Sequence, residues 1–103
     1  NGLLEYKYYK LSADQGFVRA FDGLGDCYRF GRGVPQNVAE AKRCYQIAVD
    51  NGLTVAYIGL SMSFALMRDT EKALVFAQKA AFCLIMAGRA PLIFISNLLK
   101  RLR

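Results

Sequence analysis

The sequence contains no histidine, and this absence removes several kinds of chemistry. Without an imidazole the chain cannot form a Ser-His or Cys-His nucleophile pair, a histidine-containing zinc site or an imidazole general base. It has only two prolines and is 54% hydrophobic, which excludes a disordered tail and a collagen-like chain. At 103 residues it has the length of one domain with a buried core.

Cysteine is also scarce. The three cysteines, Cys27, Cys44 and Cys83, are an odd set without a short pairing motif. Such a set argues against a fully paired disulfide framework, and we expect free buried thiols. Reduced cysteines favour a cytoplasmic localisation, although the sequence itself does not identify the compartment.

Long hydrophobic runs are missing as well. A helix needs roughly 20 apolar residues to cross a bilayer, and the longest uncharged run, residues 53–67, is shorter than that. The apolar stretch 80–99 has the length, but it contains Arg89 near its middle and the break AGRAP. We therefore expect both segments to form buried packing helices.

Basic residues outnumber acidic residues by 14 to 8, which gives a net charge of +6. This excess suits an acidic partner, a nucleic acid or an anionic membrane surface, and it also suits an ordinary soluble surface. The last residues form an amphipathic basic end, which is a candidate membrane contact: Leu98, Leu99, Lys100, Arg101, Leu102 and Arg103. A charged helix tail is the simpler interpretation of the same residues.

Two kinds of segment alternate along the chain and repeat. The aligned pairs are residues 5–16 with 41–52 and 17–28 with 53–64, both offset by 36, and residues 41–52 with 73–84, offset by 32. In the second kind of segment, small, leucine and aromatic residues recur four apart, which places them on one helical face. The pattern predicts an all-α chain of helix-turn-helix units. We expect helices at about 3–14, 18–30, 38–50, 54–67, 70–85 and 91–101, and no strand.

Residues typical of helix ends stand where these helices should begin and end. Gly16 and Gly52 follow two of them, at the place where a left-handed residue commonly closes a helix. Asn37 is a candidate N-cap, with Glu40 at the capping-box position. Asp69 is a cap candidate for the helix predicted to begin near residue 70.

Residues 20–52 carry a further pattern, with small and aromatic residues in both helices and G-x-G-V in the turn between them. The residues that meet it are Ala20, Leu24, Gly25, Tyr28, Gly31, Gly33, Val34, Ala41, Tyr45, Ala48 and Gly52. This pattern resembles the SEL-one-like repeat, a relative of the tetratricopeptide repeat. The resemblance implies a right-handed α/α solenoid of helix-turn-helix repeats, and it is strong in this central unit alone.

The resemblance divides residues 1–103 into the parts of a single repeat domain. They are the second helix of a partial repeat (2–16), a complete repeat (17–52), a divergent repeat without the G-x-G-V turn (53–86) and a C-terminal or capping helix (88–103). Because the first helix of the first repeat is missing, an apolar stripe of Leu3, Leu4, Tyr8 and Leu11 should be exposed. We therefore expect the chain to be a fragment of a longer array.

The glycine-rich stretch YRFGRGVPQN, residues 28–37, could be taken for a phosphate-binding loop. Such a loop needs a preceding strand and a Lys-Ser/Thr pair at the start of the next helix, and neither is present. Gly31, Gly33 and Pro35 instead fit a turn that ends one helix and prevents it from continuing.

Two alternative interpretations concern individual side chains. Asp22 and Asp26 are four residues apart on one helical face, as a glycosidase-like or metal-binding pair would need, but solvated surface is the simpler interpretation. Some relatives of the SEL-one-like repeat are linked with hydrolysis of cell-wall or lactam substrates. Some secreted relatives bridge the two helices of a repeat by a disulfide, and Cys27 and Cys44 lie on such paired helices, although their spacing differs from the bridged pattern.

In related repeats the first helix of each pair lines a concave groove that holds peptides or partner domains. The corresponding residues here are Arg19, Asp22, Asp26 and Phe30 in the central unit and Val55, Ile58 and Met62 in the next one. Such a groove would be charged at one end and apolar at the other. We therefore interpret the chain as a protein–protein interaction scaffold that binds a protein or peptide partner. We expect no catalysis, cofactor or metal, and nucleic-acid binding is a weaker alternative.

Overall fold

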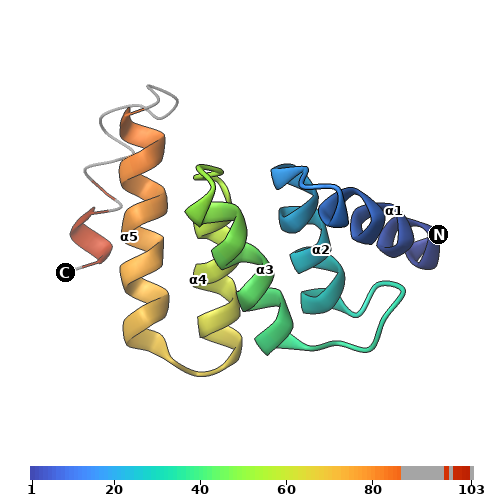
Figure 1. The fold of residues 1–103 in the computed structure, drawn as a ribbon. Helices are drawn as coiled ribbons and strands as arrows, with labels where there is room; N and C mark the ends of the chain where they lie inside the picture. Colours follow the sequence, from blue (N-terminus) through green and yellow to red (C-terminus); the bar gives the residue numbers. More distant parts are fainter. Residues whose placement is uncertain (87–96, 98, 103) are drawn as a thin grey trace.

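The computed structural model describes residues 1–86, 97 and 99–102, and residues 1–86 of it form five helices. They are α1 (Gly2–Asp14), α2 (Val18–Phe30), α3 (Val38–Asp50), α4 (Ala56–Leu66) and α5 (Thr70–Met86), as Figure 1 shows. The described residues contain no strand, which confirms the predicted all-α fold. The predicted helix 91–101 lies largely outside the described residues, although residues 97 and 99–101 are helical.

The bounds of α1, α2, α3 and α5 lie within about one residue of the prediction, whereas α4 is shorter. It begins at Ala56 rather than residue 54, because the chain before it forms a turn. There the backbone N–H of Ala56 donates to the carbonyl of Leu53 at 3.1 Å, and that of Tyr57 donates to Thr54 at 3.1 Å.

Within residues 1–86, four turns contain a residue with positive φ. Gly16 and Gly52 have φ angles of 88° and 93°, and Gly31 closes α2 with a φ of 71°, as the sequence predicted for helix-ending glycines. In the α4–α5 turn, where the sequence has no glycine, Arg68 takes a φ of 63°. An arginine there bears a steric cost that a glycine would not.

Side-chain caps hold three of the helix starts, and at α1 the side-chain oxygen of Asn1 accepts a hydrogen bond from the backbone N–H of Leu3 at 2.9 Å. Asn37 accepts a hydrogen bond from the backbone N–H of Glu40 at 3.1 Å, and Asp69 accepts one from Lys72 at 3.2 Å. The second half of the expected capping box is not formed. Instead, the Glu40 carboxylate accepts hydrogen bonds from the guanidinium of Arg43, because the two side chains are three residues apart on the same helix.

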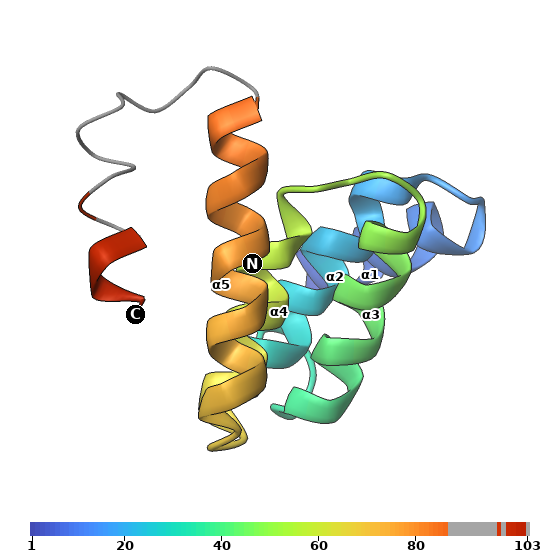
Figure 2. The ribbon, with the colours of Figure 1, turned by 90° about the vertical axis from the view of Figure 1, so that its left-hand side faces the viewer.

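The helices pack in chain order, each against the next, with one additional contact between α2 and α4. Among the described helices, the backbones of α1 and α3, and those of α3 and α5, do not come close to each other, although their side chains share core clusters. Helices α2 and α4, which are the first helices of two successive units, contact each other, whereas the second helices α1, α3 and α5 are farther apart. The row of helices therefore curves with α2 and α4 on its concave side. Figures 1 and 2 show this row, with α1 at one end and α5 at the other. The fold is an α/α solenoid.

One side-chain contact repeats along the solenoid. The ring of Tyr45 on α3 is fully buried and lies against Gly59 of α4, where there is no side chain to exclude it. Thirty-six residues earlier, the ring of Tyr9 on α1 lies against Gly23 of α2 in the same way. In both α1 and α3, a tyrosine of the second helix thus fills the space beside a glycine of the following first helix.

The apolar stripe predicted on α1 is exposed in the structure. Its members are Leu3, Leu4, Tyr8 and Leu11, and three of them leave 60% or more of their surface open. The opposite side of α1 packs on α2 through a small cluster that includes Ala13, Ala20 and Leu24.

Candidate functional site

Four of the predicted groove residues line two neighbouring cavities between α4 and α5, with Arg19 reaching one of them from α2. Arg19, Val55 and Ile58 line a cavity of about 290 Å³, and Ile58 and Met62 line a second cavity of about 220 Å³. Ile58, Ala80 and Leu84 belong to both cavities, so the two are continuous. We call this surface the α4–α5 groove; its residues are Arg19, Gly52, Leu53, Thr54, Val55, Ile58, Ser61, Met62, Ala77, Ala80, Ala81, Cys83 and Leu84.

The α4–α5 groove exists because an alanine replaces the tyrosine of the repeated contact. Ala77 occupies in α5 the place that Tyr45 has in α3, at the offset of 32. In the central unit, the Tyr45 ring fills the space between α2 and α3, and it also lies against Gly59 of α4. In the next unit the methyl group of Ala77 leaves the corresponding space open, and the second cavity forms there.

The other three predicted residues, Asp22, Asp26 and Phe30, line neither cavity of the α4–α5 groove. Phe30 is exposed at the end of α2, where the guanidinium groups of Arg29 and Arg32 lie 4.3 and 5.1 Å from its ring centre. The sequence placed these residues on one helical face, but the two aspartates are half-buried beside Arg29 rather than open to the groove.

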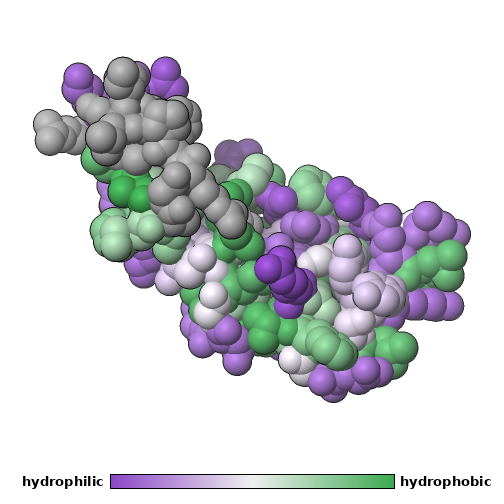
Figure 3. Space-filling view, turned by 90° about the horizontal axis from the view of Figure 1, so that it is seen from above, coloured by the Kyte–Doolittle hydropathy of each residue, from purple (hydrophilic) through white to green (hydrophobic). Residues whose placement is uncertain are grey.

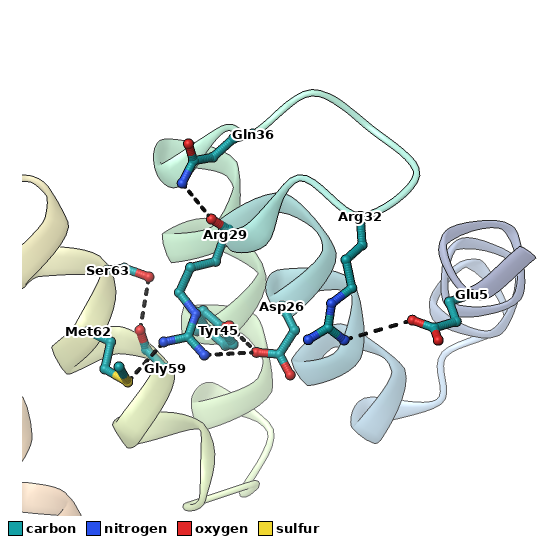
Figure 4. A network of polar contacts seen from close by, with 9 residues as sticks. All are labelled: Glu5, Asp26, Arg29, Arg32, Gln36, Tyr45, Gly59, Met62 and Ser63. Carbon is teal, nitrogen blue, oxygen red and sulfur yellow. Dashed lines mark hydrogen bonds and ion pairs between the residues drawn. The ribbon is translucent and has the colours of Figure 1, made fainter. Parts of the chain in front are cut away.

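Asp26 is part of a polar network that ties α2 to α3 and α4 (Figure 4). Its carboxylate accepts a hydrogen bond from the hydroxyl of Tyr45 and lies 3.4 Å from the Arg29 guanidinium. Arg29 in turn donates to the sulfur of Met62 at 2.9 Å. The simple interpretation of Asp26 as solvated surface is therefore wrong, because its charge is held by partners from two helices.

The family profile of the Sel1 repeat matches residues 6–17, 23–53 and 56–81. The chain belongs to the Sel1 repeat family. An uncharacterized Sel1-like repeat-containing protein of Schizosaccharomyces pombe is 40% identical over 45 residues, which are 44% of this chain and 7% of that protein. The chain thus spans a small part of the length of this relative. No solved structure matches the chain.

The segments that match the Sel1 repeat profile correspond to the helices of the solenoid. The profile covers α1 as a partial repeat, the pair α2 and α3, and the pair α4 and α5, which confirms the predicted resemblance. Sel1 repeats generally mediate protein–protein interaction and are typically non-enzymatic scaffolds. Within the described residues, no helix is long and apolar enough to cross a membrane.

Burial sets the protonation of the groups around Asp26. It raises the pKa of Asp22, and the nearby charge of Asp26 raises it further. Burial also raises the pKa of Tyr45, and the hydrogen bond that its hydroxyl donates to Asp26 adds to this effect. Tyr45 therefore keeps its proton, and the Sel1 repeat uses Asp26 as an acceptor within the fold. Among the described residues, no group of three acidic, cysteine or histidine side chains could hold a metal ion.

The three thiols of this Sel1 repeat chain are unpaired in the structure. Cys27 and Cys44 are buried, and Cys83 is half-buried beside the α4–α5 groove. Burial raises the pKa of Cys27, and it raises the pKa of Cys44 to about 11. These two thiols are therefore uncharged near neutral pH and act as small apolar core groups.

The glycine-rich turn of the Sel1 repeat packs against α1. The backbone of Gly33, with a φ of 74°, lies so close to Gly2 that no side chain would fit between them. Arg32 in the same turn forms an ion pair with Glu5 of α1 at 3.8 Å (Figure 4). The turn therefore joins one unit to the preceding one, and it gives no support to a phosphate-binding loop.

Proposed function

We propose that this chain is a protein-interaction module that holds an apolar segment of a partner protein in the α4–α5 groove. The observation that carries the proposal is the lining of the groove. Val55, Ile58 and Met62 each expose about half of their surface there, around the alanines that leave the space open. Exposed apolar side chains around a hollow are typical of interaction sites.

The position of α4 in the central unit indicates the shape of the ligand. Helix α4 packs against both α2 and α3, and Gly59 receives the ring of Tyr45. A ligand helix that entered the α4–α5 groove in the same way would meet Ala77 instead of a tyrosine ring. It would therefore need a large apolar side chain where α4 has Gly59.

Charges at the two ends of the groove indicate the polarity of the ligand. Arg19 is exposed at one end and forms no ion pair within the part of the chain that the structure describes. At the other end, the charge of Arg29 is balanced by Asp26. We therefore propose an apolar ligand with an acidic group at the end that meets Arg19.

Selection from a displayed random-peptide library tests this proposal. The 103-residue chain should enrich peptides with large apolar residues at helical spacing and an acidic residue near one end. Ile58→Glu should abolish their binding, and Arg19→Glu should weaken it, because these changes place a charge in the apolar groove and reverse the charge at its end. Phe82→Asp is the matched control, since Phe82 is exposed on α5 but lies outside the groove.

Peptides that bind the wild type and Ile58→Glu equally well would refute the α4–α5 groove as the binding site. Loss of binding in Phe82→Asp but not in Ile58→Glu would move the site to the other side of α5.

A further inference from the structure

The side of α5 that faces away from the core carries an apolar stripe among exposed polar residues such as Glu71 and Lys79. Val75, Phe82 and Met86 are 46%, 61% and 71% exposed, and their spacing places them in one stripe along the helix. The opposite side of α5 carries the buried residues Ala80 and Ala81. Leu74, also exposed, lies beside the stripe. We call Leu74, Val75, Phe82 and Met86 the α5 outer face.

The same positions of the preceding unit are charged. At the offset of 32 residues, Leu74, Val75 and Phe82 correspond to Lys42, Arg43 and Asp50 of α3. Helices α3 and α5 have the same place in their units, and both keep small residues at matching core positions. An apolar outer face at these positions is therefore not a requirement of the fold, and α3 lacks it.

Positive charge is concentrated in the same part of the chain. Residues 66–103 contain seven lysines and arginines but two acidic residues, so they carry five of the six net positive charges. The described basic residues there are all exposed: Arg68, Lys72, Lys79, Lys100 and Arg101. Of the two acidic residues, Asp69 is paired with Lys72 at 3.9 Å.

The basic and apolar groups meet on one surface. Lys79 stands within the apolar stripe, with its ammonium 4.9 Å from the ring centre of Phe76. Val75, Lys79, Phe82 and Leu99 line one cavity of about 690 Å³, which places the basic end of the chain beside α5. Figure 2 shows this end of the row, and in Figure 3 some hydrophobic side chains are visible at this end, as they are elsewhere on the same face.

We propose that the α5 outer face docks on an anionic lipid surface. The helix would lie along the membrane interface, with Phe82 and Met86 among the upper acyl chains and Lys79, Lys100 and Arg101 at the headgroups. An amphipathic helix with basic residues beside its apolar face binds membranes in this way. The excess of positive charge favours acidic lipid over a protein partner of mixed charge. This surface is separate from the α4–α5 groove.

Fluorescence of an introduced tryptophan tests the docking, because the chain contains no tryptophan of its own. Phe82→Trp places the probe on the α5 outer face, and Asp50→Trp places a matched probe at the equivalent position of α3. With phosphatidylserine-containing vesicles, emission of the Phe82→Trp chain should shift to the blue, whereas that of Asp50→Trp should not. Pure phosphatidylcholine vesicles should give little shift. Binding should weaken strongly between about 0.1 M and about 1 M salt, because the screening length falls from about 10 Å to about 3 Å.

A second variant copies the residues of α3 into α5. Val75→Arg with Phe82→Asp should keep the helix, since α3 carries these residues at the same positions. It should reduce vesicle binding by at least about tenfold, because it removes two large apolar side chains from the contact. Ile58→Glu, in the α4–α5 groove, should leave vesicle binding unchanged, so failure of one proposal is distinguishable from failure of the other.

Two results would overturn the proposal. The first is no binding of the wild-type chain to phosphatidylserine vesicles at the lower salt concentration. The second is a Phe82→Trp emission that is already shifted to the blue without lipid and does not change with it. That result would mean that another part of this chain, a second copy or a protein partner covers the α5 outer face.

Discussion

The contact between Tyr45 and Gly59 gives a sharp prediction about stability. A Cβ atom added at Gly59 would lie 2.6 Å from the Cδ1 and Cζ atoms of Tyr45. The ring cannot move away, because it is fully buried, its other face lies against Gly25, and its hydroxyl is bonded to Asp26. Gly59→Ala therefore overpacks a site that has little freedom to relax.

The expected magnitude follows from two opposing effects. Overpacking of a rigid core costs about 1–3 kcal/mol, and the upper end applies to this fully buried ring. Alanine is favoured over glycine inside a helix by about 1 kcal/mol. Gly59→Ala should therefore lower the free energy of unfolding by about 2 kcal/mol. In urea, followed by far-UV circular dichroism, the midpoint should fall by roughly 1 M.

The equivalent change at Gly23 is the control. A Cβ there would meet the ring of Tyr9 at 2.5 Å, but Tyr9 is half-buried and can turn toward solvent. Gly23→Ala should therefore change the stability by less than about 1 kcal/mol, with the helix preference offsetting the clash. In the background of Tyr45→Ala, Gly59→Ala should lose its destabilising effect. Equal effects at Gly23 and Gly59, or a stabilising Gly59→Ala, would refute the reasoning.

Three further predictions concern single side chains. Asn37→Ala removes the acceptor for the N–H of Glu40 and should lower the free energy of unfolding by about 1 kcal/mol; an unchanged Tm would contradict the cap. Burial raises the pKa of Asp22, so stability should fall as the pH rises from 3.8 through its folded-state pKa. Asp22→Asn should therefore be more stable than the wild type near neutral pH, an advantage that should disappear below pH 3.8, and denaturation at several pH values would check it. Cys27 and Cys44 should react with a thiol reagent as the protein unfolds and not before, and fewer than three free thiols in the denatured chain would contradict the unpaired state.

Helix ends could be predicted from the sequence because they depend on residues close in the chain. Gly16 and Gly52 take the positive φ expected of them, and Asn37 forms the expected cap. These features need backbone geometry that a few neighbouring residues determine. The partner of Glu40 was predicted wrongly, because Arg43 one turn later competes for the same carboxylate.

The polar network was missed because it depends on packing between helices. The sequence alone does not show that Arg29 turns toward Met62, 33 residues later, or that Tyr45 bonds to Asp26. The tyrosine–glycine contact, by contrast, had a signature in the sequence. The tyrosines at 9 and 45 and the glycines at 23 and 59 are both 36 residues apart, which is the repeat offset.

The tyrosine–glycine contact joins residues that belong to different units, and this has a consequence for how such a chain can change its length. A block of 36 residues carries one tyrosine and one glycine that form this contact. The tyrosine packs against the unit after the block, and the glycine packs against the unit before it. Duplication or loss of a whole block therefore leaves a tyrosine and a glycine at every remaining contact between neighbouring units. A substitution of the tyrosine in one block disrupts its contact with the glycine of the next block. The tyrosine of one unit and the glycine of the following unit should therefore vary together, rather than the tyrosine and glycine of the same unit.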